Sequence, residues 1–158
     1  MIGGVAEGIL KRWRLVAGAR CQGRCEVSSP GKVRSFEDLE VWKAANRLAH
    51  LVFDTTKQFP RSYLYDLATQ LRRAALSVPT NIAEGSASMH SKELIQSLNV
   101  ARRSLAETRY LLLFAREEDL IGPGRYQEVL ETCESVARML SSLMRSLNSS
   151  RRRSRNHD

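Results

Sequence analysis

Cysteine, glycine, proline and aromatic residues are scarce in this chain, and it has no long apolar run. Its 158 residues include three cysteines, nine glycines and four prolines, and 6% are aromatic. Three cysteines cannot form a disulfide framework and leave at least one thiol free, which predicts a reduced, cytoplasmic protein. The shortage of glycine and proline argues against a loop-rich or many-stranded fold. No stretch approaches the roughly 18 to 20 apolar residues of a membrane span, so we expect no membrane association.

The net charge of +8 is concentrated at the two ends of the chain. Residues 1–34 contain seven Lys or Arg against two Glu, and residues 148–158 contain four Arg against one Asp. The segment between them, 35–147, has 14 basic and 14 acidic residues and is neutral. A basic tail contacts phosphate groups without sequence preference, and it also keeps a protein soluble.

Residues 35–147 contain four apolar stretches with helical periodicity and no convincing strand pattern. The first starts after Ser35, a plausible N-cap with Asp38 as its capping-box partner. It is apolar on two faces, which is more than one neighbouring helix can cover. The four stretches span about 36–58, 64–85, 91–118 and 126–147.

The second stretch contains Pro79, which removes one backbone hydrogen bond and predicts a kink or a break in that helix. Gly85 then offers a stop, and Gly122-Pro123-Gly124 is the clearest turn in the chain. Four helices with short connections predict an all-α, up-and-down antiparallel four-helix bundle over residues 35–147. We expect both flanks, the basic segment 1–34 and the Arg-rich tail 148–158, to be disordered.

No residue pattern points to catalysis, a metal or a cofactor. Neither His50 nor His90 has the Glu three positions earlier that a di-iron bundle requires. Cys21 and Cys25 form a lone C-x3-C without a second ligand pair, so we expect no metal site. Cys133 falls on the apolar stripe of the fourth helix and is interpreted as a small core residue. We therefore predict that the protein is not an enzyme.

Two arginine pairs and one polar pair are the candidate functional residues of the bundle. The arginines could bind phosphate, or they could pair with Asp66, Glu84 or Glu107 or with another subunit. Asn81 and Glu84 follow Pro79 and suggest a polar network that satisfies backbone groups freed by the proline. The candidate nucleic-acid-binding residues are Arg72, Arg73, Arg102 and Arg103, together with Arg151, Arg152, Arg153 and Arg155 of the tail.

Several motifs resemble one known family. Ser35-Phe-Glu-Asp-Leu-Glu-Val-Trp42, Phe59-Pro60 and Gln70-Leu-Arg-Arg-Ala-Ala-Leu-Ser-Val-Pro79-Thr-Asn-Ile-Ala-Glu-Gly85 are similar to segments of the four helix bundle proteins. These are also called 23S rRNA intervening-sequence proteins. Residues 91–107 resemble the segment that follows, so the likeness covers about 35–147. The chain departs from the family at Ser86-Ala-Ser88, and at Arg102-Arg103, where the family has a small residue before the serine.

This resemblance implies a bundle that assembles into a homo-oligomer, a ring of five. Such reading frames occur in insertions within bacterial 23S rRNA genes. The family is also similar to the accessory proteins of diversity-generating retroelements, which form basic pentameric barrels that bind nucleic acid and a reverse transcriptase. Because the likeness begins near Ser35, we hypothesise that translation of the native protein starts at Val33.

Two functions remain open at the level of sequence. The first is a non-catalytic oligomer that binds nucleic acid, with RNA favoured over DNA, through its arginine-rich surfaces. The alternative is a scaffold that binds a reverse transcriptase or another protein and has no nucleic-acid role. Binding to nucleic acid should weaken steeply with salt because counterions are released, whereas a scaffold should keep its partner after nuclease treatment.

Overall fold

The computed structural model describes residues 35–88 and 90–155, and every regular element in these ranges is helical. The predicted disorder of residues 1–34 and the start at Val33 lie outside the described residues. The elements are the 3-10 helix η1 (Phe36–Asp38) and the helices α2 (Glu40–Thr56), α3 (Arg61–Leu64), α4 (Leu67–Ala87), α5 (Ser91–Glu117) and α6 (Pro123–Arg155).

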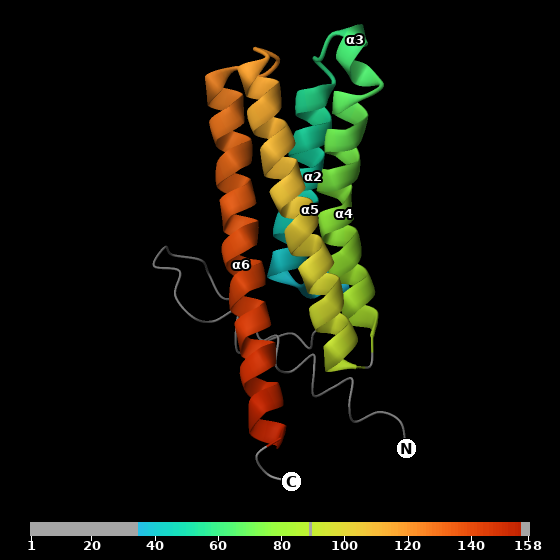
Figure 1. Cartoon of the computed structure of the whole chain (residues 1–158), viewed down its shortest axis with the longest axis vertical. Helices are drawn as coiled ribbons and strands as arrows, with labels where there is room; N and C mark the ends of the chain where they lie inside the picture. Colours follow the sequence, from blue (N-terminus) through green and yellow to red (C-terminus); the bar gives the residue numbers. More distant parts are fainter. Residues whose placement is uncertain (1–34, 89, 156–158) are drawn as a thin grey trace.

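The four long helices α2, α4, α5 and α6 form an up-and-down antiparallel bundle (Figure 1). α4 packs against α2 and α5, and α6 packs against the same two helices from the other side. The short helix α3 lies in the connection between α2 and α4. The predicted four-helix bundle is confirmed. None of these helices is both long enough and apolar enough to cross a bilayer.

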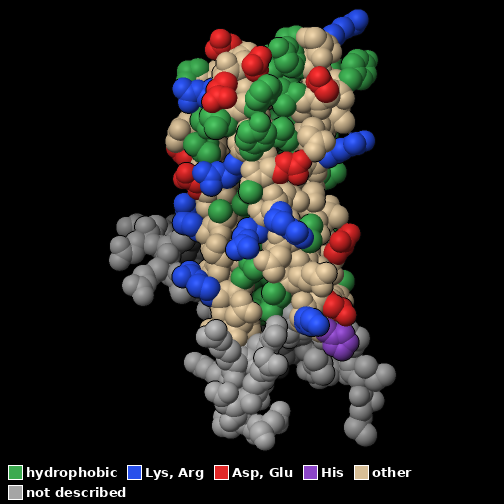
Figure 2. All heavy atoms as spheres, in the orientation of Figure 1, with side chains coloured by type: hydrophobic (Ala, Val, Ile, Leu, Met, Phe, Trp, Pro, Cys, Tyr) green, Lys and Arg blue, Asp and Glu red, His purple; other side chains and the backbone are tan. Residues whose placement is uncertain are grey.

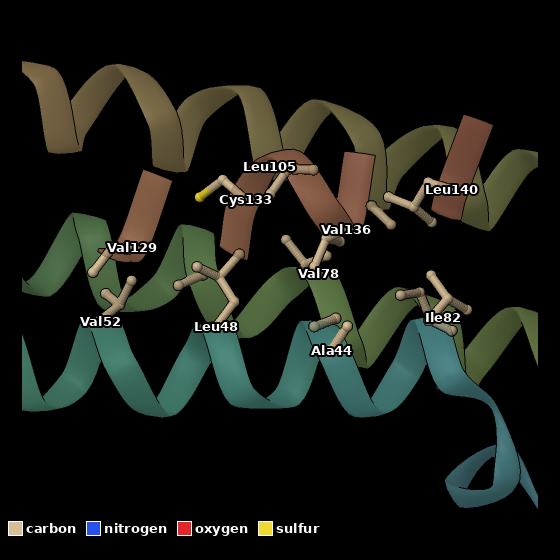
Figure 3. Close-up of a cluster of buried hydrophobic side chains, with 14 of the residues drawn as sticks. Ala44, Leu48, Val52, Val78, Ile82, Leu105, Val129, Cys133, Val136 and Leu140 are labelled. Atoms are coloured by element: carbon tan, nitrogen blue, oxygen red, sulfur yellow. The ribbon is translucent and has the colours of Figure 1, made fainter. Parts of the chain in front are cut away.

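The core consists of the apolar stripes that periodicity predicts. Side chains of all four helices meet between the ribbons in Figure 3, and Leu48, Ile82 and Leu140 have no exposed surface. Because residues three and four apart lie on one face of a helix, such a stripe turns wholly inward. Others in this core are Val52, Val78, Leu105, Val129, Cys133 and Val136.

α4 continues without a break past Pro79, which is buried inside it. The missing N–H of Pro79 frees the carbonyl of Ala75. The side chains of the two residues after Pro79 donate hydrogen bonds to the two carbonyl oxygens that follow that of Ala75. Thr80 Oγ1 donates to the Leu76 oxygen at 2.9 Å, and Asn81 Nδ2 donates to the Ser77 oxygen at 2.8 Å.

The sequence suggested that α4 ends at Gly85, but the helix continues to Ala87. Gly85 is buried at a close contact between α4 and α5. A Cβ atom added to it would lie 2.8 Å from Cβ of Ser97 and 3.1 Å from Cδ1 of Leu94. Gly85 is therefore required for close approach of two helices and not for a turn.

The turn between α5 and α6 is built by a left-handed residue at the end of α5. Asp119 has a φ of 56°, and its N–H donates to the Arg116 oxygen at 3.0 Å. Leu120 N–H donates to the Ala115 oxygen at 2.9 Å. These two bonds form a Schellman motif, which satisfies carbonyls that the helix end would otherwise leave unpaired. Pro123 then starts α6, a position that suits its fixed φ.

Candidate nucleic-acid interface

Arg72, one of the predicted binding residues, is used by the bundle itself. Its Nε donates to Oγ1 of Thr56 at 2.7 Å, and its guanidinium lies 5.5 Å from the centre of the Phe53 ring. Thr56 is fully buried, so this hydrogen bond connects α4 to the last turn of α2 inside the protein. A cation near the C-terminus of a helix is also favoured by the helix dipole. Arg72 is thus a structural residue of the bundle.

Arg125 holds the same end of α2 from the α6 side. Its Nε donates to Oγ1 of Thr55 at 2.9 Å, and it also forms an ion pair with Glu128 at 2.7 Å. Both threonines donate their own hydroxyl hydrogens to carbonyls of α2 and so accept one arginine each. Two of the arginines near this end are therefore engaged within the fold.

Arg73, Arg102 and Arg103 are exposed, and none forms an ion pair with another described residue. The acidic residues considered as their partners are placed otherwise. The Asp66 carboxylate accepts from the N–H of Leu67 at the start of α4, and Glu107 accepts from the Gln70 amide. Glu84 is exposed and forms no hydrogen bond within the described ranges.

The exposed arginines are divided between two sides of α5. Gln70 and Glu107 join α4 to α5, and Arg103 lies one turn before Glu107, so Arg103 is in the column of α5 that faces α4. Arg73 lies about one turn after Gln70 on the same side of the bundle. Arg102 lies one turn before Ala106, which lines the groove between α5 and α6. Arg102 therefore belongs to the α5/α6 side.

Two arginines of α6, Arg138 and Arg145, lie in the exposed outward column of this helix, beside the α5/α6 side. Arg102 precedes Tyr110 by eight residues and Arg138 follows Leu130 by eight, and Tyr110 and Leu130 line the same groove. Antiparallel helices with equal rise place Arg102 and Arg138 at a similar height, about 12 Å from that groove. Arg145 lies two further turns along α6. Arg138 and Arg145 are exposed and form no ion pair among the described residues.

The surface formed by residues 94–106 of α5 and 135–149 of α6 is called the basic strip below. It contains Arg102, Arg138 and Arg145, has Arg103 at its edge toward α4, and contains no Asp or Glu. The residues between the arginines are mainly small polar and apolar ones, with Ser, Asn and Gln at the surface. Figure 2 shows Lys and Arg side chains at mid-height on the side where α5 and α6 face the viewer. An unneutralised group of arginines of this kind can bind anions.

α6 extends the basic strip beyond the bundle. The helix continues to Arg155, and its end projects past the ends of α4 and α5 (Figure 1). Residues 148–155 are thus helical, whereas the sequence predicted disorder from Asn148. No Gly or Pro stops the helix there, arginine is a good helix former, and cations suit a helix C-terminus. Residues 150–155 follow the strip on this continuous helix and are called the arm. They include Arg151, Arg152, Arg153 and Arg155.

An open groove lies beside the basic strip, toward the start of α6. It has a volume of about 360 Å³ and is lined by Arg109 and by apolar and aromatic side chains. Tyr110 and Leu113 at its edge are 63% and 43% exposed, and the apolar side chains at the upper end of Figure 2 mark this region. Arg116 lies 4.9 Å from the centre of the Tyr126 ring and covers part of it. The other lining residues are Ala106, Tyr126 and Leu130.

The family described as 23S rRNA-intervening sequence protein matches residues 37–142, which is more than half of the chain. The chain belongs to this family. No curated protein is significantly similar to it. The matched segment covers α2, α4, α5 and α6 up to Ser142, so it contains Arg102, Arg103 and Arg138 but ends before Arg145 and the arm.

Arg138 and Arg145 were not among the residues predicted from the sequence. They are seven positions apart, and Arg152 follows at the same spacing, so all three belong to one column of α6. This repeat of seven was visible in the sequence. Its connection with Arg102 was not, because that depends on how α5 packs against α6.

The predicted polar pair around Pro79 is divided by the structure. Asn81 Nδ2 contacts both the carbonyl and the hydroxyl of Ser77, and Ser77 Oγ lies 2.9 Å from Ser104 Oγ of α5. Glu84 is outside this network and exposed. Polar groups at the α4/α5 contact thus bond one another, which fixes the register of the two helices.

The thiol of Cys133 is placed in the core. Burial raises its pKa to about 12, so it carries a proton at neutral pH. No group of three or more His, Cys, Asp or Glu that could hold a metal ion occurs in the described part of the chain. Cys21 and Cys25 lie outside that part.

Proposed function

We propose that this protein is a non-catalytic oligomer that binds nucleic acid, with RNA favoured, through the basic strip and the arm. The observation that carries the proposal is that arginines gather in two segments that contain no acidic residues. Two arginines in residues 94–106 and six in residues 135–155 occur without a single acidic residue, in a chain whose segment 35–147 is neutral. The four that lie in the strip are exposed and unpaired within the described residues.

Arginine carries the charge, and its planar fork of N–H donors matches phosphate oxygens. The serine, asparagine and glutamine side chains among the arginines can add hydrogen bonds to phosphate and sugar. RNA is favoured because the family takes its description from an intervening sequence of 23S rRNA. The thiol of Cys133 is buried and protonated at neutral pH, so it is not available as a nucleophile.

Self-association is supported by exposed apolar side chains on different sides of the bundle. Phe53 and Leu76 lie on α2 and α4, and Tyr110, Leu113 and Phe114 lie on α5. Two dissimilar apolar patches suit a head-to-tail contact, which closes into a ring when the rotation allows. The family resemblance sets our expectation at five subunits. A ring would repeat the strip and the arm on each subunit and raise the avidity for a long nucleic acid.

The decisive experiment compares two double variants that remove the same charge. R102Q/R138Q neutralises two arginines of the strip, and R47Q/R61Q neutralises two exposed arginines on α2 and α3. Binding of a labelled RNA hairpin is followed by fluorescence anisotropy from about 50 to about 300 mM salt. The strip variant should bind more weakly, with a salt slope reduced by up to about 2, and the control should bind like the wild type. Equal effects of both variants would refute a role of the strip.

The groove beside Tyr110 favours the second candidate function, a scaffold for a reverse transcriptase or another protein. An exposed apolar surface of this kind is typical of a protein contact. Pull-down from nuclease-treated lysate separates the two functions, because only the scaffold retains its partner. Light scattering of the purified protein at the same time measures the number of subunits. A monomeric mass would refute the oligomer.

A further inference from the structure

The basic strip and the arm lack the aromatic side chains on which unpaired bases commonly stack. Residues 94–106 and 135–155 contain no Phe, Tyr, Trp or His. Proteins that bind single strands combine a basic groove with aromatic side chains, on which successive bases stack. Double-stranded RNA is instead recognised by its shape and through its phosphates and 2′-hydroxyls. Arginines separated by Ser, Asn and Gln match this second mode.

The length and straightness of α6 agree with a double helix as the ligand. From Ser135 to Arg155 the helix is about 30 Å long, which is close to the length of one turn of duplex DNA, about 34 Å. Positions 138, 145 and 152 follow one another at about 10.5 Å along one column. α6 continues past the bundle end, so that neither α4 nor α5 flanks its last turns (Figure 1). Arginine positions spaced along a projecting helix can follow the backbone of a double helix.

Tyr110, an exposed aromatic residue of α5, lies off the strip. Tyr110 is at the edge of the groove, about 12 Å along the helix from Arg102. Glu107 and Glu134 adjoin the strip on the groove side, and Glu93 adjoins it at the other end of its α5 part. Between these acidic residues all charged side chains of the strip are positive, which favours a phosphate backbone along it.

We propose that the basic strip and the arm bind the phosphate backbone of a double helix, an RNA stem, and do not bind unpaired bases. The inference rests on the proposed nucleic-acid function and specifies its ligand. Binding should be insensitive to base sequence. The strip offers arginines for contacts with phosphates but no surface that could distinguish one base from another. A stem in RNA and a duplex of DNA share this backbone chemistry, and the 2′-hydroxyl distinguishes them.

The test uses the full-length protein and three probes of about 16 nucleotides or base pairs. They are an RNA duplex, one of its strands alone and the DNA duplex of the same sequence. We expect the RNA duplex to bind at least about tenfold more tightly than the single strand near physiological salt. If the RNA duplex binds more tightly than the DNA duplex, part of the affinity comes from contacts with 2′-hydroxyls. If the two duplexes bind equally, the affinity comes from contacts with phosphates. Both results support the proposal.

Equal or tighter binding of the single strand would overturn the inference and leave the nucleic-acid function in place. Y110L identifies that case, because it should weaken single-strand binding if bases stack at the groove and should leave duplex binding unchanged if the strip is the site. R102Q/R138Q should weaken duplex binding relative to R47Q/R61Q. Absence of binding to all three probes would instead refute the proposed function itself, so the two failures are distinguishable.

Discussion

Replacement of Gly85 by alanine tests a close contact between α4 and α5. Helix propensity alone predicts a gain, because alanine is favoured over glycine by about 1 kcal/mol in a helix interior. The added methyl group, however, would lie 2.8 Å from Cβ of Ser97. That atom is attached directly to the α5 backbone, so it cannot turn away as the end of a long side chain could. α5 or α4 has to shift.

Overpacking of a tight core typically costs about 1 to 3 kcal/mol, and a contact between two Cβ atoms belongs in the upper part of that range. After the propensity gain is subtracted, we expect Gly85→Ala to lower the free energy of unfolding by about 1 to 2 kcal/mol. Urea denaturation at one fixed protein concentration measures the change as a lower midpoint with an unchanged slope.

Gly124 provides the matched control for this substitution. It lies in the first turn of α6, and no atom is within 4 Å of the position that a Cβ would take. Gly124→Ala should therefore raise stability by a few tenths to about 1 kcal/mol. If Gly85→Ala raised stability by a similar amount, the close approach of α4 and α5 would be refuted.

Three further substitutions test other contacts. Asp119→Gly should stabilise the protein by about 0.5 to 1 kcal/mol in urea denaturation, because the residue has a left-handed φ of 56° at the end of α5; a loss of stability would contradict this. Thr56→Val keeps the shape but removes the acceptor of Arg72, so it should cost about 1 to 3 kcal/mol, and a neutral effect would mean that Arg72 finds another partner. The buried thiol of Cys133 has a pKa raised from 9.0 to about 12, so the unfolded chain ionises first and stability should fall as the pH rises above about 9. Cys133→Ala should flatten that decline, and an identical decline in both proteins would contradict the raised pKa.

The fold was largely predictable because helical periodicity is a local property. The apolar spacing along α2, α4, α5 and α6 recurs every three to four residues, and burial in the bundle follows it closely. The Gly122-Pro123 turn and the N-cap at Ser35 are local signals too, and Ser35 forms both bonds of a capping box with η1. Local sequence signals gave the wrong helix end at two places, Gly85 and Asn148. A glycine can serve a close contact as well as a stop, and a polar tail can extend a helix already fixed by packing.

The candidate site was predictable only in part. The residues predicted from the sequence include Arg102, Arg103 and the arginines of the arm, which belong to the candidate site, and also Arg72 and Arg73, which lie outside it. The partner of Arg72 is Thr56, which is 16 residues away and belongs to another helix. No pattern within α4 could indicate that this arginine is engaged while its neighbour Arg73 is exposed.

The sequence by itself determined that four amphipathic helices form, and that positive charge accumulates without acids along the last part of the chain. Both follow from composition and spacing within single helices, where side-chain direction is set by the helical repeat. Only the tertiary structure decided which arginines lie on one surface. Packing of α5 against α6 places Arg102 level with Arg138. Packing of α4 against α2 engages Arg72 with Thr56, so Arg72 is not part of the exposed surface. The unbroken α6 joins the strip to the arm. Such pairings depend on contacts between distant segments, and the charge of a surface is the sum over all helices that share it.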